Sequence, residues 1–277
     1  MSKSTCSCAT FPAEIGVGST RRGARGVPLA LVKAALDELR AEFDDIDQVL
    51  EDLVPERWLN PTPAAGWDIR DQVSHLADTN EICVDTITGG PRPLNETAMS
   101  YPSPEAFTES GCERGRAMAP PDVFAWWRAS CHAVLDALAS KQPNDRIPWG
   151  LGMSARMMAT ARLMEHWAHS ADIRGALGMG PSVTPRLHSI AFLIVRAVPY
   201  ALGVAKVPPP PGTLRAELSY DGETWHFGPD DADSVITGEA LEFCLLGVQR
   251  TTIDKVHTLK ASGPLAEAAL PNLRAFL

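Results

Sequence analysis

The stretch LVKAALDELRAEFDDIDQVLEDL, residues 31–53, places an apolar residue at every third or fourth position. This spacing is typical of an amphipathic α-helix, because 3.6 residues per turn bring such positions onto one face. The same pattern recurs in three further stretches, at about 69–87, 121–140 and from 155 onward. Four long helices with one apolar face each bury those faces best against one another. The sequence therefore predicts a mainly α-helical protein with a four-helix bundle over residues 27–180.

The ends of these helices carry recognisable signals. Asp68 and Ser154 precede the second and fourth helices, where their side chains can cap free backbone amides. Pro55 follows the first helix and is expected to end it. Residues 89–120 are rich in Gly, Pro and Ser, so this segment is expected to be a long, partly ordered connection.

The composition changes after Pro181. One more helix, expected as a connection over residues 181–205, leads to the stiff proline-rich linker KVPPPPG. Short alternating runs then predict a small α+β domain with antiparallel strands over residues 206–277. The expected strands lie at 214–220, 224–228, 234–238 and 256–263, and the expected helices at 239–250 and 264–276.

The N-terminus and the longest apolar run bear on where the protein works. Residues 1–26 combine Ser, Gly, Arg and Thr without the apolar centre of a signal peptide, so a disordered tail is expected. Residues 188–204 come closest to the run of about 18 apolar residues that a membrane span requires. Arg196 and Pro199 interrupt this run, which therefore predicts a buried helix. We expect a cytoplasmic protein without a membrane partner, as a monomer or homodimer.

The net charge and the cysteines limit the partners and the kinds of site that the sequence allows. The net charge of −9 argues against nucleic acid as a partner, because phosphates require a basic surface. Of the six cysteines, only Cys6 and Cys8 are close in sequence, which is a weak metal signal. The other four stand singly in apolar or helical surroundings and are expected to be reduced thiols without a catalytic role.

Glu165 and His169 are the residues most suggestive of chemistry. Their i, i+4 spacing places both side chains on one face of a helix, one turn apart, as two ligands of one metal ion require. His75, in the interior of the second helix, is the obvious source of a third ligand. A His/Glu/His set leaves coordination positions open, which is typical of catalytic rather than structural zinc.

Two other interpretations of this helix stay open on the pattern alone. Glu165 and His169 can belong to a solvated face, or to a salt-bridge network with Arg162 and Asp172. Small residues on the same face favour an inward orientation, and a buried carboxylate beside an imidazole then needs a partner charge. His166 points about 100 degrees away and fits a supporting or surface position. Four tryptophans are expected in the bundle core: Trp67, Trp126, Trp127 and Trp167.

Three segments resemble a known family. WLNPTPAAGWDIRDQVSHLADTNE (58–81) resembles the N-terminal signature of the mycothiol-dependent maleylpyruvate isomerase family, in which a Pro-x-x-Gly-Trp turn and an Arg-Asp pair precede the first metal histidine. ATARLMEHWAHSADIRGALG (159–178) resembles the Glu-x-x-x-His-x-x-Asp segment of that family, which belongs to the DinB-like metal-binding four-helix bundles. DSVITGEALEFCLLGVQR (233–250) resembles its sterol-carrier-like second domain. The resemblance covers about residues 28–277.

The resemblance implies a specific site and chemistry. His75, Glu165 and His169 would be ligands of a divalent metal, with zinc expected, and Arg250 would be a catalytic residue. The family ends this helix with a Gly-Arg pair, where this chain has Val248-Gln249-Arg250. A cation in the last turn also favours the helix dipole, which is the simpler explanation of Arg250. The implied function is a metal-dependent enzyme that activates a low-molecular-weight thiol, with mycothiol as cosubstrate, for addition to a small electrophilic substrate.

The thiol chemistry can follow two courses, isomerisation or S-transfer, and the residues do not distinguish them. Two alternatives remain beside it. One is a metal-dependent Lewis-acid or hydrolytic enzyme that acts on a specialised metabolite without a thiol. The other is a non-catalytic protein that binds a small molecule or lipid. The sequence favours an enzyme, because a structural zinc usually has four protein ligands, often cysteines, and no cysteine is close in sequence to these three residues.

Overall fold

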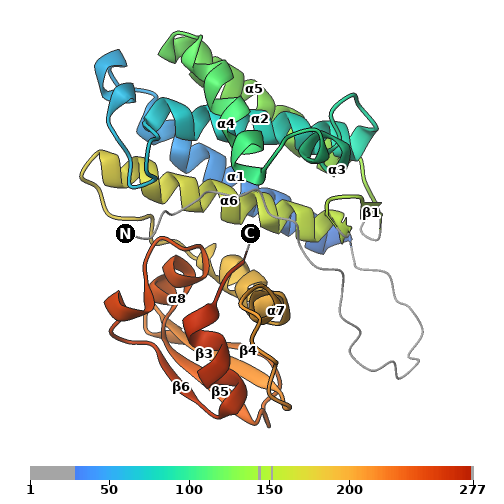
Figure 1. Ribbon diagram of the computed structural model, residues 1–277, viewed down its shortest axis with the longest axis vertical. Helices are drawn as coiled ribbons and strands as arrows, with labels where there is room; N and C mark the ends of the chain where they lie inside the picture. Colours follow the sequence, from blue (N-terminus) through green and yellow to red (C-terminus); the bar gives the residue numbers. More distant parts are fainter. Residues whose placement is uncertain (1–28, 143–144, 151, 276–277) are drawn as a thin grey trace. The chain divides into compact units, whose positions relative to one another are not determined.

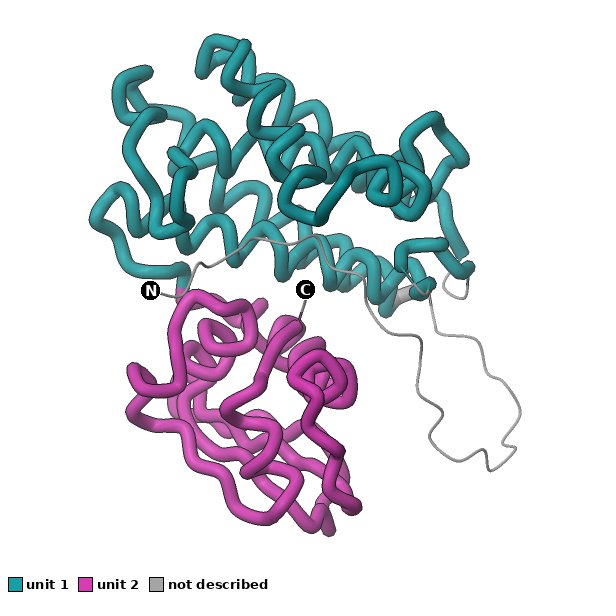
Figure 2. Tube along the Cα trace, in the orientation of Figure 1, with its two compact units in different colours: residues 1–182 teal, residues 183–277 magenta. Residues whose placement is uncertain are grey.

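The computed structural model describes residues 29–142, 145–150 and 152–275 (Figure 1). The chain divides into two compact units, and the boundary lies between Ser182 and Val183 (Figure 2). The expected tail over residues 1–26, with Cys6 and Cys8, lies outside the described residues.

The first unit contains the predicted four-helix bundle. Its helices are α1 (Leu29–Leu50), α2 (Ile69–Thr88), α5 (Pro120–Ala139) and α6 (Ala155–Ala176). Both α1 and α2 pack against α5 and α6, so the four helices enclose one core. The apolar face of α1 is buried there through Leu39, Phe43 and Ile46. The mainly helical fold of this part of the chain is confirmed.

The predicted helix starts are also confirmed. Asp68 caps α2 by accepting a hydrogen bond from the Asp71 amide, and the Asp71 carboxylate accepts one from the Asp68 amide in return. Ser154 caps α6 by accepting from the Met157 amide. The end of α1 differs from the expectation: the helix stops at Leu50, and a short 3-10 helix, η1 (Pro55–Leu59), begins at the proline.

The expectation of a partly ordered connection over residues 89–120 is wrong. This segment forms α3 (Leu94–Met99) and α4 (Pro104–Arg116), and α4 packs along α2. The glycines that suggested a loop have a packing role. A Cβ atom on Gly115 would lie 1.7 Å from Ser74 Oγ, so only glycine lets α4 approach α2 this closely. A two-stranded ribbon, β1 (Arg146–Ile147) and β2 (Met153–Ser154), precedes α6.

The second unit is built on a four-stranded sheet of order β4-β3-β5-β6. Its strands are β3 (Leu214–Tyr220), β4 (Glu223–Phe227), β5 (Ser234–Glu239) and β6 (Lys260–Ser262). The predicted strands are present, but the antiparallel arrangement is wrong for one pair, because β3 and β5 run parallel.

The loop after β4 explains the parallel pair. Residues 228–233 pass the start of β3, so β5 begins on its other side and runs in the same direction. Gly228 has φ +110°, and a Cβ atom there would lie 2.2 Å from the Leu214 carbonyl oxygen. Asp233 then accepts hydrogen bonds from the amide and hydroxyl of Thr213. The alternation of apolar and polar residues along a strand does not indicate such a crossing, so the sequence could not show that β5 runs parallel to β3.

Three helices pack with the sheet: α7 (Leu187–Val204), α8 (Ala240–Gly247) and α9 (Pro264–Ala269). Short 3-10 segments, η2 (Ile253–Lys255) and η3 (Leu270–Asn272), complete the unit. The helix expected as a connection is α7, and it packs on α8, α9 and β4. Among the described helices, α7 alone is long and apolar enough to cross a membrane, but half of it is buried and Pro199 lies inside it. These features are those of a core helix.

Candidate metal centre

Three side chains from two helices meet inside the bundle. His75 comes from α2, and Glu165 and His169 come from α6, one helical turn apart. One potential ligand atom from each residue lies within 4.8 Å of the other two. His169 Nε2 is 3.7 Å from Glu165 Oε2. The structure thus brings together the three residues that the sequence singled out as metal ligands.

The surroundings keep water away from this cluster. The exposed fractions of His75, Glu165 and His169 are 2%, 7% and 1%. Helix α6 is buried along nearly its whole length, because α1 packs on one side and α2 on another. Its small residues Ala161 and Ala168 are buried as well, which permits close packing of the neighbouring helices. The interpretation of a solvated Glu/His face is therefore excluded.

The donor set fits a divalent cation. Two imidazoles and one carboxylate are ligands that zinc accepts, and a low-dielectric site strengthens their attraction for a cation. Burial of a carboxylate next to imidazoles is costly unless a positive charge offsets it. Three protein ligands leave at least one coordination position for water or substrate. The three residues could therefore hold a metal ion, whose identity they do not specify.

Aromatic rings surround the two histidines. The ring centroids of His75 and His169 lie 4.8 Å apart. Trp67 packs against both, at 5.2 Å from His75 and nearly parallel to His169 at 6.2 Å. Trp67 is half-buried, so its predicted place in the bundle core is wrong: it forms a wall of the candidate centre. The indole ring restricts the orientations that either imidazole can adopt.

Of the other predicted core tryptophans, Trp127 and Trp167 are buried as expected. Trp126 is half-buried instead, and the prediction fails there because its neighbours are charged. Its indole nitrogen donates to Glu81, and the guanidinium of Arg114 lies 4.0 Å above its ring.

Gln72 and Thr62 form a chain of hydrogen bonds that ends at Nδ1 of His169. His169 Nδ1 lies 2.5 Å from Gln72 Oε1. Gln72 Nε2 donates to Thr62 Oγ1 over 2.9 Å, and Thr62 Oγ1 lies 2.9 Å from the carbonyl oxygen of Trp67. Sequence reasoning missed both residues. Gln72 lies about one helical turn before His75, and Thr62 directly precedes the Pro-x-x-Gly-Trp turn.

A second buried polar layer lies next to the candidate centre. Arg162 is 2% exposed and donates to Thr79 Oγ1 and Asn80 Oδ1. Asn80 in turn donates to Ser130 on α5. Two neutral side chains of α2 are thus acceptors for this guanidinium inside the bundle.

His166 belongs to this second layer. It is fully buried rather than at the surface, and its Nδ1 lies 2.8 Å from the Arg162 carbonyl oxygen. Its ring packs edge-on against Phe43. Burial, together with the nearby Arg162 cation, lowers the pKa of His166 well below its usual range. His166 is therefore a neutral packing residue and is not among the three grouped side chains.

Arg250 lies in the second unit, just beyond α8. Its amide donates to the Leu245 carbonyl and its Nη1 to the Val248 carbonyl. The preceding Gln249 has φ +59°, so the chain turns sharply between the helix and Arg250. The guanidinium thus bonds the carbonyl of the C-cap residue of α8, where a cation also interacts favourably with the helix dipole. The side chain is half-buried, and Arg250 is not among the three grouped residues of the first unit.

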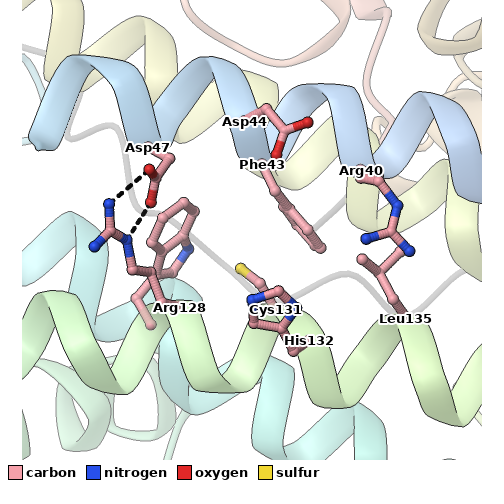
Figure 3. Close-up of a pocket in the computed structure, with 9 residues that line it drawn as sticks. Arg40, Phe43, Asp44, Asp47, Arg128, Cys131, His132 and Leu135 are labelled. Atoms are coloured by element: carbon pink, nitrogen blue, oxygen red, sulfur yellow. Dashed lines mark hydrogen bonds and ion pairs between the residues drawn. The ribbon is translucent and has the colours of Figure 1, made fainter.

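A groove on another side of the bundle has different chemistry. It lies between α1 and α5 and encloses about 180 Å³ (Figure 3). Asp47 and Arg128 form an ion pair at one end, and Arg40 lies at the other. Cys131 lines the groove, but burial raises its pKa well above the usual range, so its thiol stays protonated. None of the three grouped residues lines this groove.

Comparisons with known proteins place this geometry in context. Residues 39–174 match the family model of the mycothiol maleylpyruvate isomerase N-terminal domain. An uncharacterised protein of Mycobacterium tuberculosis, present in strains CDC 1551 and H37Rv, is 36% identical over 241 residues, which cover 86% of this chain and 93% of that protein. Crystal structures of the mycothiol-dependent maleylpyruvate isomerase and of its mutant match with a TM-score of 0.59 and 15% identity, over 90% of this chain and 97% of theirs. At this identity the structural likeness shows the fold.

Proposed function

The chain belongs to the mycothiol maleylpyruvate isomerase family, and we propose on that premise that it is a divalent-metal-dependent enzyme that activates a low-molecular-weight thiol. The observation that carries this proposal is the buried group of His75, Glu165 and His169. The thiol proposed is mycothiol, the cofactor named for the structural relatives. The substrate class proposed is a small electrophile with a carboxylate.

Each residue of the candidate centre has a role in this scheme. His75 and His169 would donate imidazole nitrogens, and Glu165 would donate a carboxylate oxygen. A divalent ion held by these three residues would lower the pKa of a thiol bound to it, which would keep the sulfur as thiolate at neutral pH. Trp67 packs on both imidazoles and shields them from water. Exclusion of water strengthens the electrostatic interactions within the site.

The thiolate would act as the nucleophile of the reaction. Its sulfur adds to one carbon of a double bond conjugated to a carbonyl, and the electron pair of that bond moves toward the carbonyl oxygen. In an isomerase, rotation about the resulting single bond and expulsion of the sulfur restore the double bond with the opposite geometry. In an S-transferase, the carbon takes a proton and the sulfur stays attached.

Arg250 is proposed to hold the carboxylate of the substrate. A guanidinium offers paired N–H donors that match the two oxygens of a carboxylate. It would also stabilise negative charge that moves toward the substrate carbonyl during addition. Arg250→Lys keeps the positive charge but loses the paired geometry, so we expect a loss of turnover with little change in stability. Full activity of this variant would contradict the role of Arg250.

Metal content tests the proposed function most directly. We expect the purified full-length protein to contain about one equivalent of divalent metal by elemental analysis, and His169→Ala to lose it while the helical content stays unchanged. His132→Ala, which removes an exposed histidine of α5, is the matched control and should keep the metal. Equal metal content in the two variants would refute the assignment of the ligands.

Thiol dependence is tested separately. The metal-loaded protein is assayed with candidate electrophilic acids in the presence of mycothiol, of another small thiol, or of no thiol. We expect turnover to be fastest with mycothiol, or to occur only when mycothiol is the thiol supplied. Equal turnover without any thiol would instead support metal-dependent hydrolysis or Lewis-acid catalysis at the same centre.

A further inference from the structure

The hydrogen bonds behind His169 have a fixed direction. Thr62 Oγ1 lies 2.9 Å from the carbonyl oxygen of Trp67 and 2.9 Å from Gln72 Nε2. A carbonyl oxygen only accepts, so the single hydroxyl proton of Thr62 points to Trp67. The hydroxyl oxygen can then only accept a hydrogen bond from Gln72. The side-chain atom of Gln72 that faces Thr62 must therefore be the NH2 group, which settles the orientation of the amide.

This orientation determines the tautomer of His169. The Gln72 oxygen faces His169 Nδ1 at 2.5 Å, and an amide oxygen has no proton to donate. His169 Nδ1 must carry the proton of this hydrogen bond. A histidine binds metal in its neutral form, which has one N–H, so in that form the lone pair of His169 lies on Nε2. Nε2 is the nitrogen that lies 3.7 Å from Glu165 Oε2, while Nδ1 is taken up by Gln72.

We propose that Gln72 is a positioning residue that fixes the tautomer and the ring orientation of His169 for metal binding. This inference rests on the proposed function, because it concerns the same centre. Gln72 would act only through His169 and would contact neither metal nor substrate. Partners of this kind raise the basicity of a histidine ligand and restrict its rotation.

Thr62, at the start of this chain of hydrogen bonds, is itself held in place by backbone contacts. The Thr62 amide donates to the Trp67 carbonyl over 2.8 Å, so backbone and side chain of Thr62 bond the same oxygen. Pro61 pairs with Asp68 across the turn, and the Trp67 amide donates to the Ala64 carbonyl. Gln72 is fully buried, so water cannot replace either of its hydrogen bonds. The acceptor for His169 is thus set in position by local structure before a metal binds.

Substitutions at Gln72 test this role through metal affinity. Gln72→Leu removes the acceptor, and we expect zinc to bind about 10–100-fold more weakly. Gln72→Glu keeps an acceptor for Nδ1, and the Thr62 hydroxyl can turn its proton to the second carboxylate oxygen. We expect this variant to bind zinc within a few-fold of the wild type, as a rescue. Gln48→Leu makes the same chemical change at an exposed position of α1 and should leave the affinity unchanged.

The tautomer can be measured directly. Long-range 1H–15N NMR spectra of the metal-free wild type should show His169 with the proton on Nδ1, and Gln72→Leu should lose this preference. A proton on Nε2 in the wild type would overturn the inference, as would wild-type zinc affinity in Gln72→Leu. If Gln72→Leu does not fold, Thr62→Val takes its place, with a smaller expected loss of affinity. If the wild-type protein binds no metal, the proposed function is refuted. The NMR measurement of the His169 tautomer in the metal-free protein still supports or overturns the role of Gln72.

Discussion

Gly247 offers a quantitative test of how α7 and α8 pack in the second unit. Gly247 is the last residue of α8, and a Cβ atom there would lie 2.4, 2.7 and 2.8 Å from Cδ1, Cγ1 and Cγ2 of Ile194 on α7. Ile194 is fully buried, and the three atoms belong to both of its branches, so rotation of one branch cannot relieve the overlap. Overpacking of this kind costs about 1–3 kcal/mol.

A second effect opposes this cost. Alanine stabilises the interior of a helix relative to glycine by about 1 kcal/mol at most, and the last turn by less. We therefore expect Gly247→Ala to lower the free energy of unfolding by about 1–2 kcal/mol. Gly203→Ala is the matched control, because Gly203 lies in the last turn of α7 and a Cβ atom there would have no neighbouring atom within 4 Å. That substitution should raise stability by up to about 1 kcal/mol.

The assay is urea unfolding of the full-length protein, with hydrogen exchange to assign the change to α7 and α8. Ile194→Ala removes all three overlapping atoms and alone should cost about 2–5 kcal/mol. In the double variant, the methyl group that Gly247→Ala introduces occupies part of the space that the Ile194 side chain leaves. We expect the double variant to be more stable than the sum of the single effects by at least about 1 kcal/mol. Additive effects, or a stabilising Gly247→Ala, would refute the packing argument.

Three further predictions follow from buried groups. The Tyr200 hydroxyl is buried without a hydrogen-bond partner among the described residues, and burial raises its pKa from 10.0 to about 12. Ionisation of Tyr200 therefore has no effect on stability below pH 10 and lowers it as pH rises from 10 toward 12, so Tyr200→Phe should flatten this decline in urea titrations without a loss of stability at pH 7. Arg116→Ala leaves the buried carboxylate of Asp71 without its two-nitrogen partner, and because Arg116 is 34% exposed we expect a loss of about 1–3 kcal/mol, measured by urea unfolding. Burial raises the pKa of Cys83 to about 11 and that of Cys244 further, so mass spectrometry should find neither thiol alkylated by iodoacetamide at about pH 7 until denaturant is added.

Periodicity and capping chemistry were enough to predict the bundle. The four helices follow apolar spacing, and Asp68 and Ser154 start two of them as expected. Helix α4 was missed because its glycines serve packing against α2, and composition cannot distinguish a packing glycine from a loop glycine. The parallel pairing of β3 with β5 was missed because alternation defines a strand but not its direction.

The residues of the candidate centre also fall into two groups: those that the sequence could predict and those that it could not. Glu165 and His169 could be paired from sequence, because a helix fixes the relation of residues four apart. Their proximity to His75 could only be proposed, since the packing of α2 against α6 depends on the whole bundle. Spacing places Gln72 one helical turn before His75, but it does not show that Gln72 or Thr62 has a role. Their importance depends on which atom donates each hydrogen bond, and this appears only in three dimensions.

The turn before α2 acquires a physical explanation from these contacts. Gly66 has φ +86°, a conformation that favours glycine, and it lets the chain reverse directly before Trp67. The ring of Trp67 then packs on His75 and His169, while its carbonyl oxygen accepts the Thr62 hydrogen bond that orients Gln72. Residues that would never touch a metal ion thus determine how its ligands are presented. The Pro-x-x-Gly-Trp turn and the Glu-x-x-x-His pair, about 100 positions apart in the sequence, therefore form a single structural unit around the candidate centre.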